Sequence, residues 1–590
     1  MRYVLIVFCL LGIISGSLSQ TLPEDRKVDW SQAGLRDTST FGFLEIDMGI
    51  YGAMGDGETS NDSIVAQAIS SLNDAGVILK FPEGNFLFNQ SISLPSNTII
   101  KGQGAENTIF TINLGGTGQS IAIKGYADEL DTTSLVQFAA KDSNFIRVSD
   151  PIGFSIGDWI QIIQDDSDLV TSVWAKNTVG QIVRITDITD DEVTISSPLR
   201  LEYGMEKKPY IQKIIPVQNV GVECLKIERK DNTEPEQTSN VYFKYAVNCW
   251  VRGIESHKCT FSHIEARNSS NLKVSQSYFH NGFDYGVDGR AYGVMLHFTT
   301  NECLIENNIF KQLRHSMIVQ SGANANVFAF NYSEEPLWYT IPTDAAGDMV
   351  LHGNYPYCNL FEQNICQNIV IDNSHGPNGP DNSFLRNRGA GYGIFFSESN
   401  SPGQNLLGNE VTNLNLPYSY VNYTILGAGH FIYGNYDKGV IDPLGTTMLA
   451  DSSYYYSERP DFVPLSQWVE IGNPASPGTS SIPARDRFKA NEIFKDACEI
   501  FSTTTAKQNI KNAPGIMIFP NPIISSLKFE SRLFVKHIEV INGLGQVQQS
   551  FVDPGFSKQI QTDNWLGHIF LVKFTFSDNR WIVKKVIRVN

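Results

Sequence analysis

The sequence predicts an all-β protein whose main body is a right-handed parallel β-helix. Three observations predict it. Short apolar strands recur from residue 220 onward, and each is followed by an asparagine or a small residue at a shared position. Residues 43–104 have the pattern of a cap for the open end of such a helix. No leucine repeat or helical period accompanies the strands, so a leucine-rich or helical solenoid does not explain them.

We expect five parts, because 590 residues are too many for one ordinary domain. In order, they are a signal peptide (1–19), an N-terminal cap with the first β-helix coils (40–135), a small β insertion (136–215), the main β-helix with a C-terminal strap (216–510), and an Ig-like β-sandwich (513–590). Hydrophobic residues make up 42% of the chain, which is enough to build cores for the folded parts.

The N-terminus has the features of a secretory signal peptide. Met1 and Arg2 supply a positive start, and residues 3–14 are apolar but too few to span a bilayer. Small residues at Ser17 and Ser19 then form a cleavage site. We therefore expect export, with a mature chain that begins near Gln20. No later stretch is long and apolar enough for a transmembrane helix.

A turn, a helix and a strand follow one another in the expected cap. The turn at 51–57 has the sequence YGAMGDG. Ser60 or Asn61 is the expected helix N-cap. The apolar face of the helix consists of Val65, Ile69 and Leu72. Gly76 ends the helix, and residues 77–86 (VILKFPEGNF) form a strand and a second turn.

This segment resembles the N-terminal signature of the rhamnogalacturonase/epimerase-like pectate lyase superfamily, whose members have the pattern GA.GDG.TD and later FP.G.Y. The resemblance implies that the helix closes the open end of a β-helix. Such a cap is needed because the first coil would otherwise expose unpaired strand edges and an apolar core. The resemblance covers residues 43–104 and specifies the fold more than the reaction.

The small β insertion is predicted from alternating strands at 145–148, 159–163, 182–185 and 193–195, which Asp and Gly turns separate. Asp165, Asp166 and Asp168 lie in one of these turns. Carboxylates of this kind can bind calcium. Solvated turn carboxylates are the interpretation that we favour.

The main β-helix is predicted from a ladder position, which is the shared position after each strand. Its occupants are, in order, Gly253, Ser277, Asn308, Asn331, Asn364, Asn387, Asn409 and Asn435. Successive occupants lie 24, 31, 23, 33, 23, 22 and 26 residues apart. These steps suit the coils of a three-sided β-helix, with loops in the longer ones. Stacked asparagine amides would then hydrogen-bond from coil to coil.

Two further parts follow the coils. Residues 452–485 are rich in Tyr, Pro, Ser and Gly and are expected to form a strap that lies back over the solenoid. After Asn512 the chain resembles the C-terminal sorting domain of the type IX secretion system of Bacteroidota. The resemblance rests on Pro520-Asn521-Pro522, on the GLGQ segment at 543–546 and on the basic end at 584–590. It implies an Ig-like sandwich, the type IX secretion machinery as a partner, and a secreted or cell-surface location. The alternative is a carbohydrate-binding sandwich.

Charge and cysteine content exclude several classes of protein. The formal net charge is -17 and no stretch is dense in Lys and Arg, which argues against nucleic acid as a partner. An anionic polysaccharide stays open, because local Arg and His clusters can oppose the overall field. Seven of the 8 cysteines follow the signal peptide, without CxxC spacing. We expect neither a zinc site nor a disulfide framework, and interpret these residues as small buried hydrophobes.

A candidate site comes from the strands that precede the ladder position. Each of these strands ends in an outward polar residue, and 11 or 12 residues separate that residue from the next ladder residue. We expect one outward row made of His297, Gln320, His352, Asp372 with His375, and Glu398. A groove is expected between loops at 283–293 and 333–348. Three of the 10 histidines in one row favour a site over a scaffold.

The candidate residues fall into two sets. The candidate catalytic residues are His297, Arg314, His315, Asp348, His352, Asp372 and His375. The candidate substrate-binding residues are Asp288, Arg290, Tyr292, Gln320, Arg386, Arg388 and Glu398. No metal site is assigned, and calcium is the one cofactor considered.

Two chemistries fit these residue types. A polysaccharide lyase needs a base for the proton α to a uronate carboxyl group and a cation for the enolate. His297 or His352 is the base in this version, Arg314 is the cation, and Asp348 or Asp372 orients a histidine or holds calcium. A glycoside hydrolase needs two carboxyl groups, for which Asp348 with Asp372, or Asp288 with Glu398, are the pairs considered.

The family signatures do not choose the reaction. The polygalacturonase motifs do not occur in order in these coils, and the pectate lyase Trp-Ile-Asp-His and Arg-x-Pro-x-x-Arg elements are missing. We predict a secreted polysaccharide-degrading enzyme, with β-elimination on a uronate-containing polysaccharide preferred over hydrolysis. A non-catalytic β-helix that binds glycans at the cell surface is the third hypothesis. A glycan binder gains little from clustered His with Arg and Asp.

Overall fold

The computed structural model describes most of the chain in two compact units, Met1–Cys498 and Glu499–Asn590. The described residues are 21–36, 43–70, 76–231, 236–286, 288–414, 423–463, 468–498, 516–519, 525–542, 547–565, 569–577 and 581–588. The expected signal peptide, Leu72, Pro520-Asn521-Pro522 and the GLGQ segment at 543–546 lie outside them. In the described part, no helix is long and apolar enough to cross a membrane.

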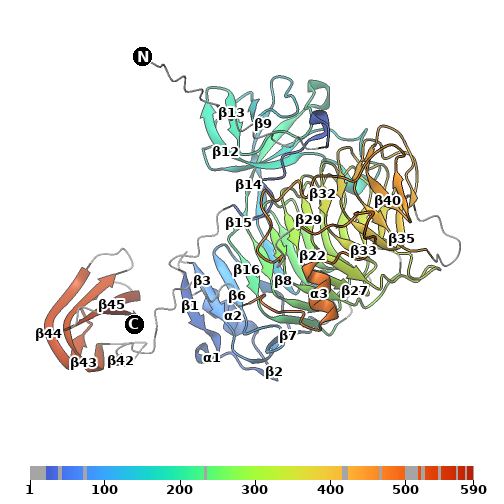
Figure 1. The fold of residues 1–590 in the computed structure, drawn as a ribbon. Helices are drawn as coiled ribbons and strands as arrows, with labels where there is room; N and C mark the ends of the chain where they lie inside the picture. Colours follow the sequence, from blue (N-terminus) through green and yellow to red (C-terminus); the bar gives the residue numbers. More distant parts are fainter. Residues whose placement is uncertain are drawn as a thin grey trace, which may run out of the picture. The chain divides into compact units, whose positions relative to one another are not determined.

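One wall of the first unit is a 12-stranded parallel sheet (Figure 1). Each strand is short and comes from a successive turn of the chain. In spatial order the strands are β1 (Leu44–Asp47), β3 (Val77–Lys80), β6 (Thr98–Lys101), β16 (Gly221–Glu223), β20 (Trp250–Arg252), β23 (Lys273–Ser275), β26 (Leu304–Glu306), β29 (Val327–Ala329), β32 (Leu360–Glu362), β34 (Ser383–Leu385), β36 (Asn405–Leu407) and β39 (Phe431–Tyr433). The order follows the sequence throughout, which is the topology of a solenoid.

The other walls belong to a connected 21-stranded sheet. One series of parallel strands in it is β17 (Lys226–Arg229), β21 (Glu255–His257), β24 (Tyr278–His280), β27 (Ile309–Lys311) and β30 (Tyr332–Glu334). A second series is β18 (Val241–Lys244), β22 (Ser262–Arg267), β25 (Tyr292–His297), β28 (His315–Val319), β31 (Met349–Leu351), β33 (Ile365–Ile371) and β35 (Arg388–Phe396). These strands confirm the parallel β-helix.

Further strands complete both ends of this sheet. They are β2 (Asp56–Ser60), β4 (Gly84–Phe88), β5 (Ile92–Ser93), β7 (Thr108–Ile112), β8 (Ile121–Lys124), β37 (Glu410–Val411), β38 (Tyr423–Thr424), β40 (Asn435–Asp437) and β41 (Val440–Asp442). The pair β15 (Val217–Gln218) and β19 (Ala246–Val247) forms a separate two-stranded sheet. Antiparallel pairing of β41 with β40 turns the chain back at the last coil.

The apolar core runs through the inside of the coils from the cap to the last strands. The expected capping helix is present as α2 (Asp62–Ser70), which buries Val65 and Ala68 in that core. A short helix, α1 (Met48–Tyr51), precedes it, and the side chain of Asp47 accepts a hydrogen bond from the amide of Ile50. The buried face of α2 covers the open end, as the sequence pattern predicted.

The asparagine ladder is present and fully hydrogen-bonded. The Nδ2 atom of each residue donates to the Oδ1 atom of the next, at distances of 3.0 Å from Asn308 to Asn331, 3.0 Å from Asn331 to Asn364 and 2.9 Å from Asn364 to Asn387. The same contact continues from Asn387 to Asn409 at 3.1 Å and from there to Asn435 at 2.9 Å. All of these side chains are buried, so the ladder satisfies polar groups inside the wall.

The ladder position was assigned one residue too early in the first coil. The amide of Ile254 donates to Ser277 Oγ, so Ile254 and not Gly253 occupies the position there. Gly253 has a φ of 60°, and the residues before the other ladder positions, such as Asn307 and Phe330, also have positive φ. This left-handed residue forms the bend between two walls, and glycine adopts it without strain.

A second ladder, which the sequence did not reveal, runs along another corner. Asn326 donates to Asn359 at 2.9 Å, Asn359 to Asn382 at 2.9 Å, and Asn382 to Gln404 at 3.0 Å. All four side chains are buried. Two of the bends are therefore held by side-chain amides as well as by backbone hydrogen bonds.

The small β insertion is a six-stranded antiparallel sheet (Figure 1). Its spatial order is β10 (Phe145–Arg147), β13 (Glu192–Ile195), β12 (Gln181–Thr189), β11 (Trp159–Ile163), β14 (Tyr210–Ile215) and β9 (Tyr126–Ser134). The strand β9 begins ten residues before the expected start at 136. The sheet has a core of its own, which includes Ile160, Val183 and Tyr203.

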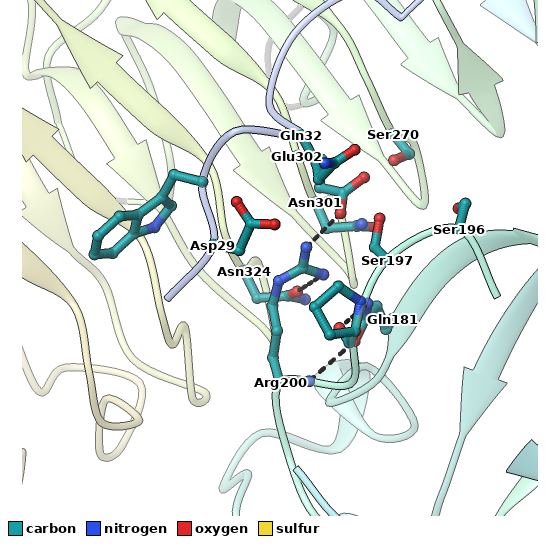
Figure 2. Close-up of polar contacts among 12 residues, drawn as sticks. Asp29, Gln32, Gln181, Ser196, Ser197, Arg200, Ser270, Asn301, Glu302 and Asn324 are labelled. Atoms are coloured by element: carbon teal, nitrogen blue, oxygen red, sulfur yellow. Dashed lines mark hydrogen bonds and ion pairs between the residues drawn. The ribbon is translucent and has the colours of Figure 1, made fainter. Parts of the chain in front are cut away.

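A buried ion pair joins the insertion to the coils (Figure 2). Arg200 of the insertion bonds Glu302 at a coil corner, and both side chains are almost completely buried. The amide of Ile182 also donates to Oδ1 of Asn301 at 3.1 Å, and Nδ2 of Asn301 donates to the carbonyl oxygen of Ile182 at 3.0 Å. Because a buried charge without its partner is costly, these contacts hold the insertion in one position on the coils.

The strap packs on the outer face of the 12-stranded sheet, as expected. Tyr454, Tyr455 and Tyr456 pack against a cluster that contains Leu304, Val327 and Leu360 of that sheet. The helix α3 (Pro483–Lys489), orange in Figure 1, contacts β27. Cys498 at the end of the strap is bonded to Cys224. We had expected every cysteine after the signal peptide to be a small buried hydrophobe, and the disulfide corrects this for Cys224 and Cys498. The other five cysteines are free and buried, as expected: Cys249, Cys259, Cys303, Cys358 and Cys366.

In the second unit, the described strands form one antiparallel sheet. They are β42 (Ile516–Phe519), β43 (Ser526–Asn542), β44 (Val547–Gln561), β45 (Ile569–Phe576) and β46 (Trp581–Ile587). Phe529, Val540, Trp565 and Phe574 belong to its buried core. The Ig-like sandwich stays a prediction for this unit.

Candidate active site

Strand register places a row of outward polar residues at the ends of β25, β28, β31 and β33. Leu296 pairs with Val319, Val319 with Leu351, and Leu351 with Ile371. These residues point into the core, so the next residue of each strand points outward. The row therefore consists of His297, Gln320, His352 and Asp372. Its next member is Ser397, because Ile371 pairs with Phe396, and Glu398 lies one residue beyond the row.

His352 and Asp372 are in direct contact. The Nδ1 atom of His352 lies 2.6 Å from Oδ2 of Asp372. In the described part of the chain Nδ1 of His352 makes no hydrogen bond of good geometry, so this is a close polar contact between the ring and the carboxylate. Burial acts to raise the pKa of Asp372, but His352 and the bonds from Ser374 outweigh it and hold the pKa well below its usual range. An ionised Asp372 favours the tautomer of His352 with its proton on Nδ1.

His315 lies beside this pair and is held neutral. Its ring centroid is 5.3 Å from that of His352, and its Nδ1 donates to the carbonyl oxygen of Gly347 at 2.8 Å. Burial, together with the positive charges of His352 and Arg314, lowers the pKa of His315 well below its usual value. Its Nε2 therefore keeps a lone pair that can accept a proton.

Tyr292 and Arg314 complete the group. The ring of Tyr292 lies 5.0 Å from that of His315, and the guanidinium of Arg314 lies 6.0 Å from the Tyr292 ring centroid. Arg314 also donates to the carbonyl oxygen of Gly286 at 2.5 Å. Among the described residues, its buried Nε has no hydrogen-bond partner. The first loop thus positions this cation next to Tyr292 and His315.

His375 forms the boundary with the insertion. Its ring lies 4.9 Å from that of His352 and 5.5 Å from that of Trp174, which belongs to a loop of the insertion. Burial, then the charge of His352, lowers the pKa of His375. We call Tyr292, Arg314, His315, His352, Asp372 and His375 the histidine cluster.

Two predicted catalytic residues are held away from this cluster. His297 lies at the row position but bonds the buried Glu265 at 3.1 Å, and burial lowers its pKa to about 4. Asp348 is buried at a corner, where it accepts hydrogen bonds from Ser333 at 2.5 Å and from the amide of Asn368 at 2.9 Å. Burial raises the pKa of Asp348 to about 6. The structure therefore does not bring Asp348 and Asp372 together as a reactive carboxyl pair.

The predicted binding residues are spread over several places. Arg386 donates to the carbonyl oxygens of Leu449 and Asp451, just before the strap, and of Ile471 within it, and Arg388 bonds Glu410 and the carbonyl oxygen of Ser480. Both arginines are buried. Asp288 is exposed on the first loop, where Arg290 pairs with Asp284 at 3.3 Å. Gln320 donates to the carbonyl oxygen of His352 at 3.0 Å.

Sequence reasoning missed two features beside the cluster. The first is Trp174, whose only sequence signal is an aromatic residue in an insertion loop. The second is a cavity of about 360 Å³ at the neighbouring corner. It is lined by Gln312, Glu335, Pro336, Leu337, Asp344, Gln367, Gly391 and Tyr392. Tyr392 donates to Asp344 at 2.9 Å, and Glu335 pairs with Lys311 at 3.1 Å.

Of the three calcium candidates, Asp165 and Asp168 are exposed, in agreement with solvated turn carboxylates, whereas Asp166 has another role. Asp166 is buried and accepts hydrogen bonds from the amides of Asn177, Thr178 and Val179 at 2.8, 2.8 and 2.9 Å. It shapes the insertion loop and is not a solvated turn carboxylate. Across the described ranges, no group of three or more His, Cys, Asp or Glu side chains is arranged to hold a metal ion.

Comparison with known proteins supports the pectate-lyase-like β-helix. The sequence model of the family "Rhamnogalacturonase A/epimerase, pectate lyase-like" matches residues 49–205. The match covers the cap, the first coils and most of the insertion. It agrees with the resemblance in the cap, and it stops before the coils that carry the histidine cluster.

The similar proteins include several from bacteriophages. A capsule K1-specific depolymerase of Klebsiella phage K64-1 is 25% identical over 155 residues, which are 26% of this chain and 17% of that protein. A pre-neck appendage protein of Bacillus phage B103 is 41% identical over 61 residues, or 10% of this chain and 7% of that protein. This chain therefore spans less than a fifth of either relative. Among solved structures, the tailspike gp61 of Pseudomonas phage phi297 has a TM-score of 0.46 at 10% identity, covering 87% of this chain and 98% of that one.

Proposed function

We propose that the protein cleaves a uronate-containing extracellular polysaccharide by β-elimination at the histidine cluster. The observation that carries this proposal is the position of His315, whose ring lies 5.3 Å from that of His352 and 5.0 Å from that of Tyr292, the ring that the Arg314 cation faces. A neutral base beside a cation is what proton removal next to a carboxyl group requires.

Each group has a role in this proposal. The Nε2 atom of His315 takes the proton from the carbon α to the uronate carboxyl group, and Arg314 stabilises the negative charge that develops on the carboxylate. The bond to the glycosidic oxygen at the β carbon then breaks, and His352, protonated on both ring nitrogens, gives that oxygen the proton of Nε2. Asp372 keeps the proton on Nδ1 and stabilises the doubly protonated ring. A positioned acid or base of this kind contributes roughly 10²- to 10⁴-fold in rate.

Two lines support a polysaccharide outside the cell as the substrate. The pectate-lyase-like match covers the first coils, and one partial relative is named as a capsule depolymerase. The N-terminal segment and the resemblance at the C-terminus favour secretion, with the type IX machinery as a partner and a secreted or cell-surface location. The net charge of -17 makes local cations such as Arg314 necessary for an anionic substrate.

Hydrolysis is the second candidate, because the corner cavity contains two carboxyl groups. Glu335 and Asp344 both line it, and a hydrolase needs an acid and a second carboxylate across the scissile bond. In this version the cavity holds the cleaved bond, and the histidine cluster binds the neighbouring sugars.

The test uses the mature protein on polygalacturonate, alginate, hyaluronan and iota-carrageenan. Absorbance from 4,5-unsaturated sugars and new reducing ends are measured together. Unsaturated products that His352→Gln and Asp372→Asn both abolish support elimination at the cluster. Reducing ends without that absorbance, lost in Glu335→Gln, support hydrolysis. Binding of a polysaccharide without any product would leave only a glycan-binding role.

A further inference from the structure

We infer that Trp174 is a platform on which a sugar ring of the polysaccharide stacks, next to the histidine cluster. This inference rests on the proposed function for the identity of the ligand, and it adds a binding subsite built by the insertion. In this inference the insertion contributes a residue to substrate binding.

The loop that carries Trp174 is held rigidly within the insertion. Three consecutive amides, from Asn177 to Val179, donate to the buried carboxylate of Asp166. Thr178 donates from its hydroxyl group to the carbonyl oxygen of Ala175 at 2.6 Å. Residues Val173–Ala175 form a single 3-10 turn, in which Ala175 is fully buried. The backbone on both sides of the indole is therefore fixed.

The same loop is bonded to the coils that carry the cluster. The amides of Thr171 and Ser172 both donate to Asn354 Oδ1 at 3.1 Å. The hydroxyl group of Thr171 donates to the carbonyl oxygen of His375 at 2.9 Å. At the other end of the loop, Thr299 donates to the carbonyl oxygen of Thr178 at 2.6 Å. These contacts fix the loop relative to His352 and Asp372.

The indole of Trp174 is supported on one side and open on the other. It contacts the edges of the Phe298 and His375 rings, at centroid distances of 5.8 and 5.5 Å. Nevertheless, 49% of the residue is exposed. A half-exposed Trp on a rigid turn leaves apolar surface in water, which is unfavourable. Its packing against Phe298 and His375 does not explain why a large aromatic residue is held at this exposed position. Val173 beside it is 80% exposed and makes no ring contact in the described part of the chain.

A sugar ring suits this open face better than a protein partner does. The apolar surface ends at His375, and charged or polar groups of the cluster follow directly. A pyranose has one face of C–H groups for the indole and hydroxyl groups on its rim for the histidines. Trp174 therefore selects sugars with a continuous C–H face at this subsite. The polysaccharide then runs from the cluster along the edge of the insertion.

The test compares Trp174→Ala, Trp174→Phe and the matched neighbour Val173→Ala. Binding of the four polysaccharides is measured by calorimetry in the His352→Gln background, in which turnover is blocked. We expect Trp174→Ala to weaken binding roughly two- to tenfold, Trp174→Phe to retain most of it, and Val173→Ala to leave it unchanged. In the wild-type background, Trp174→Ala should raise KM more than it lowers kcat.

The outcomes separate this inference from the proposed function. If the wild type cleaves a polysaccharide and Trp174→Ala behaves as Val173→Ala does, the platform is overturned and the proposed function stands. If the wild type binds without cleaving and Trp174→Ala weakens binding, the platform stands and the proposed function fails. If none of the four polysaccharides binds, both are overturned. Circular dichroism and thermal unfolding show that each variant is folded.

Discussion

Asp372 extends the row of polar residues by one coil beyond His352, and the 2.6 Å contact between Nδ1 of His352 and Oδ2 of Asp372 joins two coils of the β-helix. The two residues are 20 positions apart in the sequence and become neighbours because β31 and β33 pair in register. The row therefore creates a histidine–carboxylate pair that neither strand contains by itself.

Loss of the carboxylate at this pair should reduce activity without unfolding the protein. Replacing Asp372 by Asn keeps the shape but removes the charge that selects the tautomer of His352. We expect kcat to fall roughly 10²-fold or more on a cleaved polysaccharide. Asp168→Asn, at an exposed carboxylate of the insertion, is the control and should retain full activity. Equal kcat values for the two variants would contradict the role of the pair.

Activity should persist at acidic pH, because the proposed base has a lowered pKa. Burial and two nearby cations lower the pKa of His315, so the neutral form survives at pH values where an ordinary histidine is protonated. Activity is then lost only as pH falls through that lowered pKa. Arg314→Gln removes one of the cations, so the pKa of His315 should rise and the acid limb of kcat/KM should move to higher pH. The control Arg314→Lys keeps the positive charge, so the acid limb of kcat/KM should stay at the wild-type pH. If the acid limb does not move in Arg314→Gln, His315 is excluded as the base.

The middle of the asparagine ladder should be essential for stability. Asn364→Ala deletes the donor to Asn387 and the acceptor used by both the amide and the side chain of Asn331. Because these groups are buried, the free energy of unfolding should fall by about 3 kcal/mol or more. Asn107→Ala, at an exposed asparagine, should change it by less than about 0.5 kcal/mol. Urea unfolding measures both, and similar values for the two variants would mean that the ladder adds no stability.

The disulfide should stabilise the first unit measurably. The bond between Cys224 and Cys498 closes a segment with a sequence separation of 274. Its loss should lower the free energy of unfolding by roughly 2–4 kcal/mol. We expect reductant to lower the Tm of the wild type. It should lower the Tm of the control variant Cys249→Ala equally, because that variant loses one free buried cysteine and keeps the disulfide. The variant with both Cys224→Ala and Cys498→Ala should start at the lower Tm and show no response to reductant. A reductant effect that survives in this variant would assign the stabilisation elsewhere.

The C-terminal unit should be dispensable for folding and activity. The chain divides into two compact units at Cys498 and Glu499, so a protein that ends at residue 512 retains the β-helix and its strap. We expect unchanged Tm and kcat for this truncated protein. In the native host it should stay in the periplasm if residues 513–590 carry the export signal. Normal surface delivery of the truncated protein would show that the sorting assignment is wrong.

Features with a local sequence signal could be predicted. The ladder could be found because one residue type recurs at one place per coil, and the row of His297, Gln320, His352 and Asp372 follows from the same register. The ladder position was assigned wrongly to Gly253 because a glycine forms the bend in that coil. The true ladder position there holds Ile254, whose side chain is not polar and gives no signal. A bend and a ladder residue are adjacent in every coil, so one atypical coil is enough to confuse them.

Features built from distant segments could not be predicted. Arg386 and Arg388 flank the ladder residue Asn387 in sequence, yet they bond backbone carbonyl groups 63 to 92 positions later, in and just before the strap. The contact of Trp174 with His375 and the bond between Cys224 and Cys498 span similar or greater separations. No periodic pattern marks such contacts, because each occurs once and depends on how two separate parts dock.

The asparagine ladder also bears on how such a chain can change its length in evolution. Each ladder side chain accepts hydrogen bonds from the coil before it and donates to the coil after it, so every coil of the ladder presents the same acceptor on one face and the same donors on the other. Duplication of the segment between Asn364 and Asn387 would place a new asparagine between two existing ones with every amide still paired. Whole coils can therefore be gained or lost as modules, and the row of outward residues can lengthen while the cap, the insertion and the fold stay as they are.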